Sequence, residues 1–192
     1  MTDPVLAPAN RCYPTPESLG PLVRAVAPGH HRGGAGSHGI THWARVLENG
    51  LRLAPATGAN VPVVALFAVF HDARRLNDGR DPGHGERGAL LARELRAQWL
   101  DLADAEMDLL HRACAHHTGG RTDADVTVRT CWDADRLDLP RAGVRVRPEW
   151  LCTAPARERA IIDWAGERSL ERFEPGFVEG WRLESGVTRA AR

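Results

Sequence analysis

The sequence contains no lysine, and all 25 of its basic residues are arginines, set against 25 aspartates and glutamates. The formal net charge is therefore zero at pH 7. Proteins that bind nucleic acid usually carry an excess of basic residues on one face, so this balance argues against a nucleic-acid polymer as partner. Because arginine is the only basic residue, the number of arginines alone is not evidence for phosphate binding.

Cysteine is scarce and scattered, since Cys12, Cys114, Cys131 and Cys152 form no Cys-x-x-Cys pair. This spacing argues against a zinc knuckle and does not indicate a disulfide framework. The longest apolar run is far shorter than the roughly 20 residues that span a membrane. The first residues also lack the basic and apolar segments of a signal peptide. We therefore expect a cytoplasmic protein that does not enter a membrane.

No stretch alternates as a half-buried strand would, and no internal repeat occurs, so the sequence predicts an all-α fold. The 192 residues and the 43% hydrophobic content suit one domain with a real core. Residues 1–36, rich in proline and glycine, predict an N-terminal extension with one short helix. We expect the main domain at 37–153, and a C-terminal helix and tail at 154–192 that pack on it. The expected longer helices are 38–54, 61–72, 86–100, 103–118, 125–139 and 155–173.

The stretch from Val61 to Asp72 is the centre of the predicted fold. Every residue from Val63 to Phe70 is apolar, so this helix has no polar face and should be buried on all sides. It ends in an imidazole and a carboxylate, His71 and Asp72. A carboxylate that enters an apolar interior is costly unless it is paired or neutralised. The sequence therefore predicts a metal ion at this end of the helix.

Further candidate donors lie in two other predicted helices. His42 precedes Val46 by four residues and so lies beside the apolar stripe of helix 38–54. His38 lies one turn earlier, at a spacing that lets two imidazoles share a metal. For His38 we favour the simpler interpretation of a hydrogen-bonded core histidine. In helix 125–139, aspartates are interleaved with large apolar residues, and we expect Asp138 on a solvated face.

The order of these residues resembles the HD-domain superfamily of metal-dependent phosphohydrolases. The resemblance covers roughly residues 37–140 and implies an HD-like helical bundle with its metal site between central helices. By match to the last motif, Asp135 is the expected ligand, with Asp133 as the alternative. The motifs are His42-Trp-Ala-Arg45-Val46, similar to the family's H-x-x-R-V; Phe70-His71-Asp72; and Ala134-Asp135-Arg136-Leu137, similar to A-D-[RK]-L.

Two more histidines resemble the second-metal ligands of some superfamily members. His84-Gly-Glu-Arg resembles the third element of the pattern, and His117-Thr-Gly is similar to the His-Thr-x-Gly of the family's diadenosine-tetraphosphate hydrolases. The alternative is that both are surface histidines and one metal binds. Imidazoles with carboxylates suit Mn²⁺, Fe²⁺, Zn²⁺ or Ni²⁺. The resemblance thus implies one or two metals, held by His42, His71, Asp72, Asp135, His84 and His117.

The resemblance implies hydrolysis of a small phosphoester, with a nucleotide as one candidate, by a water that the metal activates. Asp72 would bridge two metals, and Arg74, Arg75 and Arg45 are candidates to hold phosphate oxygens. Arg45 has the alternative role of bracing the site through a buried carboxylate. Alanine and arginine follow His71-Asp72 where mononuclear nucleotidases and guanosine-tetraphosphate hydrolases tend to carry a glutamate, so those activities are not supported.

Two other functions remain open at this stage. On the same fold, a similar histidine pattern can carry a di-iron centre that activates O₂, which would make the protein an oxygenase. The protein could instead be a non-catalytic, metal-stabilised binding protein. The sequence does not indicate an oligomeric state.

Overall fold

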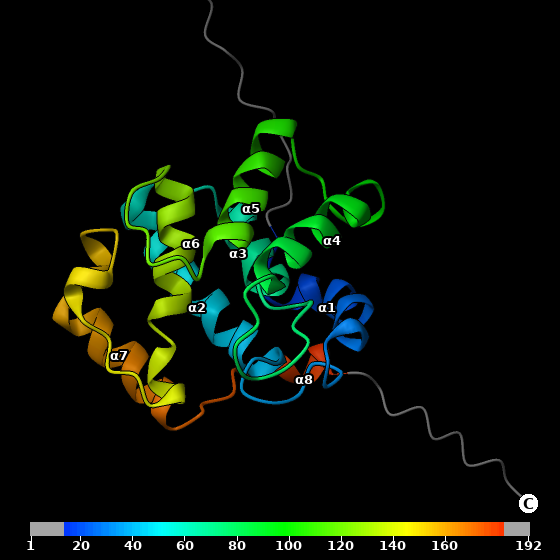
Figure 1. Cartoon of the computed structure of the whole chain (residues 1–192). Helices are drawn as coiled ribbons and strands as arrows, with labels where there is room; N and C mark the ends of the chain where they lie inside the picture. Colours follow the sequence, from blue (N-terminus) through cyan, green and yellow to red (C-terminus); the bar gives the residue numbers. More distant parts are fainter. Residues whose placement is uncertain (1–13, 183–192) are drawn as a thin grey trace, which may run out of the picture.

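The structure, a computed structural model, describes residues 14–182, which form helices joined by turns and loops (Figure 1). Within this range no residue lies in a strand, so the predicted all-α class is confirmed. The elements in chain order are η1 (Glu17–Leu19), α1 (Gly20–Val26), η2 (Ala27–Gly29), α2 (Ile40–Thr57), α3 (Val61–Phe70), α4 (His84–Trp99), α5 (Asp104–His116), α6 (Val126–Arg136), η3 (Leu139–Ala142), η4 (Pro148–Trp150), η5 (Pro155–Arg157), α7 (Arg159–Leu170) and α8 (Val178–Trp181).

Helix α3 is the buried centre of the molecule. Its residues from Pro62 to Phe70 are all buried, and it packs against α2, α4, α5 and α6. The Asn60 side chain caps it by accepting a hydrogen bond from the backbone N–H of Val63 at 3.1 Å. The helix ends at Phe70, so His71 lies in the turn that follows. The predicted burial on all sides is confirmed.

Glycines let the neighbouring helices approach α3 closely. A Cβ on Gly50 of α2 would lie 2.4 Å from Cγ1 of Val64. A Cβ on Gly88 of α4 would lie 2.1 Å from the carbonyl oxygen of Phe70. Any larger side chain would push these helices apart. The close packing positions the first turn of α4 beside the end of α3.

The C-terminal elements cover two separate parts of the molecule (Figure 1). Helix α7 covers a small second apolar cluster that includes Leu53, Leu137 and Ala165. Helix α8 packs on α1, and the indole N–H of Trp181 donates to the carbonyl of Pro16 at 2.7 Å. None of the helices in residues 14–182 combines the length and the apolar character needed to cross a membrane.

Candidate metal centre

The first group of donors comes from α2, from the turn after α3 and from α6. The Nε2 atoms of His42 and His71 lie 3.0 Å apart. Oδ1 of Asp135 lies 3.4 Å from Nε2 of His42 and 3.8 Å from Nε2 of His71. Oδ2 of Asp72 is 3.6 Å from both. These four expected ligands thus converge on one point between the central helices.

The second group lies on the other side of Asp72. His84, in the first turn of α4, and His117, just after α5, approach each other with 2.9 Å between their Nε2 atoms. Oδ1 of Asp72 is 3.1 Å from Nε2 of His84 and 3.6 Å from Nε2 of His117. Both histidines are buried, so they are not surface histidines. The two oxygens of one carboxylate therefore face different pairs of imidazoles.

Hydrogen bonds at Nδ1 fix which nitrogen of each ring faces the centre. In His71, His84 and His117, Nδ1 lies against a backbone carbonyl three or four residues earlier. A carbonyl only accepts, so Nδ1 carries the proton and Nε2 of the neutral ring presents a lone pair. Two lone pairs that face each other at about 3 Å repel unless a proton or a cation lies between them. This donor set fits metal ions.

The fourth imidazole, that of His42, is oriented by Asp138. Its Nδ1 donates to Oδ2 of Asp138 at 2.7 Å, and Arg45 donates to both oxygens of the same carboxylate at 2.7 and 3.0 Å. The expectation of a solvated Asp138 was wrong, because α6 ends at Arg136 and the following turn directs this carboxylate inward. Burial alone would raise the pKa of Asp138, but the hydrogen bonds of His42 and Arg45 outweigh it and lower the pKa to about 2.

Burial and the neighbouring charges set the pKa values of the donors. Burial lowers the pKa of His71 to about 3, although nearby carboxylates act in the opposite direction. Burial raises the pKa of Asp72, but the charge of His71 and hydrogen bonds from other histidines hold it well below its ordinary value. Burial would lower the pKa of His117, but the nearby carboxylates of Asp72 and Asp135 outweigh it and raise the pKa, so a metal bound at the second group would displace a proton from this ring. Ionised carboxylates and neutral imidazoles are the forms that bind a metal.

Arg75 approaches the second group directly. Its NH1 lies 3.3 Å from Oδ1 of Asp72 and 3.2 Å from Nε2 of His84. The other nitrogens of this buried guanidinium donate to two backbone carbonyls of the following turn. Arg74 points elsewhere, since a Cβ on Gly29 would collide with its guanidinium. In residues 14–182 that guanidinium makes no side-chain hydrogen bond or ion pair.

Arg141 and His38 also approach the first group; the sequence did not indicate Arg141, and for His38 it favoured a role in the core. NH2 of Arg141 is 3.2 Å from Nε2 of His42 and 3.4 Å from Nδ1 of His38. Its Nε and NH1 donate to the carbonyls of Ser37 and Asp138 at 2.9 and 2.6 Å. In so arginine-rich a chain, no sequence signal distinguishes this residue. The signal for His38 was its spacing of four residues from His42.

Nδ1 of His38 lies 2.8 Å from Oδ2 of Asp72, so the expected hydrogen-bonded histidine is present. Its partner is a candidate ligand, and the His38 side chain is 18% exposed. His38 is therefore at the solvent edge of the site and not in the apolar core. Together with His42 and Asp72 it forms a further group of atoms close enough to hold a cation.

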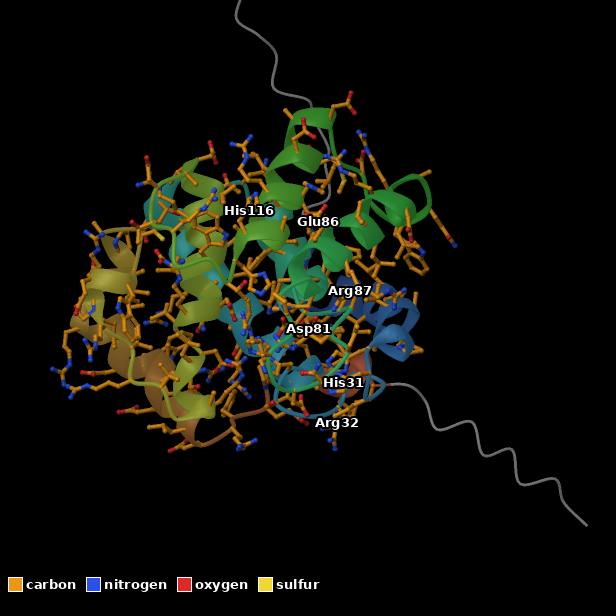
Figure 2. All side chains as sticks on the ribbon, viewed as in Figure 1. His31, Arg32, Asp81, Glu86, Arg87 and His116 are labelled. Atoms are coloured by element: carbon orange, nitrogen blue, oxygen red, sulfur yellow. The ribbon has the colours of Figure 1, made fainter. Side chains whose placement is uncertain are left out.

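Asp81 holds the turn that carries His84. Its carboxylate accepts hydrogen bonds from the backbone N–H of Leu76 and from Arg87, beside which it lies in Figure 2. Its backbone carbonyl accepts the Nδ1 proton of His84. This buried carboxylate thus fixes the ring orientation of a donor through the main chain.

Asp133 takes no part in either donor group. It is fully buried, and it accepts hydrogen bonds from the backbone N–H groups of Cys152 and Thr153 at 2.7 and 2.8 Å. The hydroxyl of Thr153 donates to it at 2.7 Å. Burial raises the pKa of Asp133, and these hydrogen bonds oppose the increase. Its role is to tie the segment after η4 to α6.

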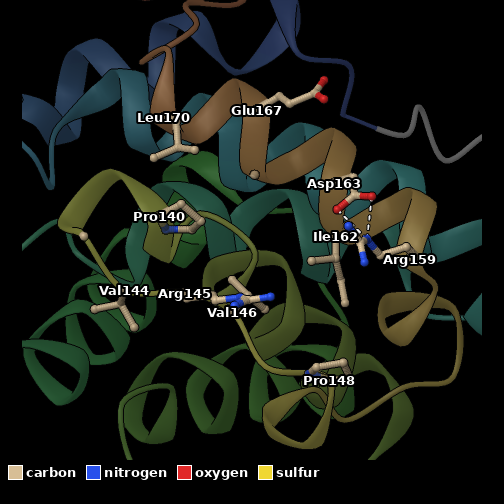
Figure 3. A pocket seen from close by; sticks show the side chains of 12 residues that line it. Pro140, Val144, Arg145, Val146, Pro148, Arg159, Ile162, Asp163, Glu167 and Leu170 are labelled. Atoms are coloured by element: carbon tan, nitrogen blue, oxygen red, sulfur yellow. Dashed lines mark hydrogen bonds and ion pairs between the residues drawn. The ribbon is translucent and has the colours of Figure 1, made fainter.

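Two cavities differ in their relation to the donors. The larger, about 640 Å³, lies between α7 and the segment that follows η3 (Figure 3). It is lined by apolar residues and by the ion pair of Arg159 with Asp163, and none of the donors lines it. A cavity of about 440 Å³ is lined by His117 and Asp135. The smaller cavity therefore gives access to the donor centre.

No protein-family model matches the sequence, and no curated protein matches it. Among solved structures, the chain is similar to the crystal structure of a predicted HD superfamily hydrolase from an uncultured Thermotogales bacterium. The two chains are 25% identical, with a TM-score of 0.60, and the match covers 79% of this chain and 86% of the other.

The fold and the site define an all-helical domain with a buried candidate metal centre of histidines and aspartates. With the structural similarity, these features define an HD-like fold with a candidate metal site. The resemblance predicted from the sequence is confirmed, and so is the location of the His/Asp cluster between central helices.

Proposed function

We propose that the protein is a metal-dependent phosphohydrolase that cleaves a small phosphoester. The observation that carries this proposal is the pair of Nε2–Nε2 contacts, at 3.0 and 2.9 Å, on the two sides of one buried carboxylate. Four imidazole lone pairs directed at two points are costly to maintain without cations. The fold similarity to a predicted hydrolase supports the same conclusion.

The proposed ligands divide into two sets that share Asp72. His42, His71 and Asp135 would complete the first set, and His84 and His117 the second. These donors suit divalent Mn, Fe, Zn or Ni. When bound, such a metal supplies a Lewis acid and lowers the pKa of water to about 7, which provides a nucleophile at neutral pH.

Two guanidinium groups are placed to position the phosphoryl group. NH2 of Arg141 and NH1 of Arg75 point at His42 and His84, whose lone pairs a metal would take. Their N–H groups then need another acceptor, and an anionic phosphoryl oxygen provides it. Backbone carbonyls hold the rest of each guanidinium, so little freedom is lost on binding.

The other two predicted arginines take different parts in this proposal. Arg45 positions the site through Asp138, which is the bracing role considered from the sequence. Arg74 packs on Gly29, so we leave it out of the catalytic set.

Phosphoester hydrolysis tests the proposal, followed as phosphate release from monoesters and as release of the alcohol from diesters. The full chain, purified without a histidine tag and loaded separately with Mn²⁺, Fe²⁺, Zn²⁺ and Ni²⁺, is assayed on a panel of phosphomonoesters and phosphodiesters. We expect turnover with at least one metal and its loss in Asp72→Ala. The control, Asp163→Asn, changes an exposed carboxylate that pairs with Arg159 and should keep the activity.

The alternatives give different results in the same preparation. An oxygenase would show O₂ consumption and the electron paramagnetic resonance signal of a mixed-valent di-iron centre, without phosphate release. A binding protein would hold metal and hydrolyse nothing on the panel. Either result would contradict the proposed phosphohydrolase.

A further inference from the structure

The cavity beside the donors has the size of a small-molecule site. Its volume of about 440 Å³ lies in the usual range for ligand pockets. His117 lines it and belongs to the second donor group, while Asp135 lines it and belongs to the first. Trp150 and Glu149, from η4, also line it. A ligand in this cavity therefore contacts the donors of both groups and an indole ring.

Trp150 is exposed, and its backbone is held in place. The residue is 39% exposed. Its carbonyl accepts a hydrogen bond from Arg136 at 2.6 Å, and its N–H donates to Arg147 at 3.0 Å. Arg136 directly follows Asp135, so the end of α6 supplies a donor and also fixes the tryptophan. The backbone that carries the ring is thus fixed relative to the donors.

The surroundings of Trp150 leave it available for stacking. The guanidinium of Arg147 lies 5.2 Å from the centre of the ring, but Arg147 does not line the cavity. It therefore packs on the indole without filling the cavity. Flat rings stack on such aromatic side chains with little dependence on their identity.

The charges along the cavity define what a ligand must carry at each end. Glu149 is exposed and, within residues 14–182, has no side-chain hydrogen bond or ion pair. A carboxylate accepts hydrogen bonds and repels a second anionic group. Thr118 and Thr122 line the same cavity and offer hydroxyl groups. Arg136 also lines the cavity, but its guanidinium already donates to the carbonyls of Trp150 and Arg121. The end at Trp150 thus suits an uncharged ring with N–H groups, and the donor end suits the phosphate.

We infer that Trp150 is a specificity-determining residue that selects a phosphoester bearing a flat aromatic ring with hydrogen-bond donors. The inference rests on the proposed function, because the phosphate end is assigned to the donor centre. A nucleoside monophosphate and an amine-bearing aryl phosphate share this chemistry. A sugar phosphate lacks the ring, and a polyphosphate would bring negative charge to Glu149.

Binding of phosphonates tests the inference apart from catalysis, since their P–C bond resists hydrolysis. The metal-loaded full chain is titrated by calorimetry with methylphosphonate, phenylphosphonate, 4-aminophenylphosphonate and an adenine-bearing phosphonate. We expect the ring to increase affinity about ten-fold or more in the unmodified protein. Trp150→Ala should lose this gain, Trp150→Phe should keep most of it, and all three proteins should bind methylphosphonate equally.

Two comparisons complete the experiment. Trp99→Ala is the matched control, because that indole is 36% exposed and does not line this cavity. If the adenine-bearing probe binds more tightly, the ring-bearing substrate is a nucleotide. If the aminophenyl probe binds more tightly, the substrate is a smaller aryl phosphate. Both results support the inference.

The inference is overturned if the ring adds no affinity in the unmodified protein. It is also overturned if Trp150→Ala and Trp150→Phe weaken methylphosphonate and phenylphosphonate equally, which would mark Trp150 as purely structural. Phosphate release without any effect of Trp150 would leave the proposed function in place and remove only this inference. Ring-dependent binding without phosphate release on any substrate would remove the proposed function alone.

Discussion

The imidazole of His42 is held from both sides of its ring. Nδ1 donates to Asp138, Nε2 faces the donor centre, and Arg45 fixes the carboxylate in turn. Such a carboxylate sets the tautomer of a ligating histidine and increases its basicity. At the scale of the residue, the site therefore depends on side chains that do not touch a metal themselves.

Replacement of Asp138 by asparagine tests this support. The change removes the charge that stabilises the His42 tautomer and leaves Arg45 without its ionic partner. We expect metal affinity to fall about 10- to 100-fold, measured by competition with a chelator of known affinity. Asp163→Asn, at an exposed ion pair, should leave the affinity unchanged. Unchanged affinity in Asp138→Asn would contradict the proposed role.

Arg141 provides a separate test of substrate positioning. Its removal takes away a charged hydrogen bond to the phosphoryl group, which is worth about 1.5–3 kcal/mol. We therefore expect Arg141→Ala to lower kcat/KM about 10- to 100-fold, with the metal content unchanged. Arg145→Ala is the matched control, since Arg145 lines the remote cavity. Normal kcat/KM in Arg141→Ala would show that the arginine only packs beside His42.

At the scale of the element, α4 depends on having no side chain at two positions. A Cβ on Gly85 would lie 2.3 Å from the carbonyl oxygen of Cys114, and one on Gly88 would lie 2.1 Å from that of Phe70. Backbone atoms cannot move aside as a flexible side chain can. These glycines therefore let α4 carry His84 to the donors that follow α3 and α5.

Substitution of Gly88 by alanine should move α4 and the second donor group together. We expect a loss of about 1–3 kcal/mol in the free energy of unfolding, measured with denaturant. We also expect a lower metal content, because His84 moves away from Asp72. Gly166→Ala in α7 is the matched control: nothing lies within 4 Å of its Cβ, and it should stabilise by up to about 1 kcal/mol. Equal effects of the two substitutions would contradict the close packing.

The elements differ in how far the sequence could predict them. Helix α3 was predictable because a fully apolar segment has no alternative to burial. The end of α6 was not predictable. The local sequence is the same whether Asp138 faces solvent or turns back to pair with Arg45. His84 was expected just before α4 but lies in its first turn, because Gly83 precedes the helix as its N-cap. Such boundaries depend on tertiary contacts.

At the scale of the whole molecule, the site joins distant parts of the chain. His42 and Asp138 are 96 positions apart, and His84 and His117 are 33 apart. Motif resemblance predicted which histidines and aspartates meet. It could not predict Arg141, whose guanidinium reaches His42 from η3, or Trp150, whose carbonyl accepts a hydrogen bond from Arg136. The donor centre was thus accessible from sequence, but its surroundings were not.

A centre built from several helices should couple metal binding to folding. A ligand at 100 times its Kd adds about 2.7 kcal/mol when only the folded state binds it. For a chain of this length, each kcal/mol corresponds to about 2–4 °C in Tm. We expect removal of metal with a chelator to lower Tm by about 5–10 °C in calorimetry. Re-addition of metal should restore it. A Tm independent of metal would contradict the coupling.

Metal content is the most direct test of the central claim. The full chain, purified without a histidine tag, is measured by inductively coupled plasma mass spectrometry beside Asp72→Ala. We expect about two transition-metal ions per chain and a large loss in the variant. One ion per chain would remove His84 and His117 from the proposed ligand sets. No bound metal, even after reconstitution, would contradict the claim that these imidazoles form a metal centre.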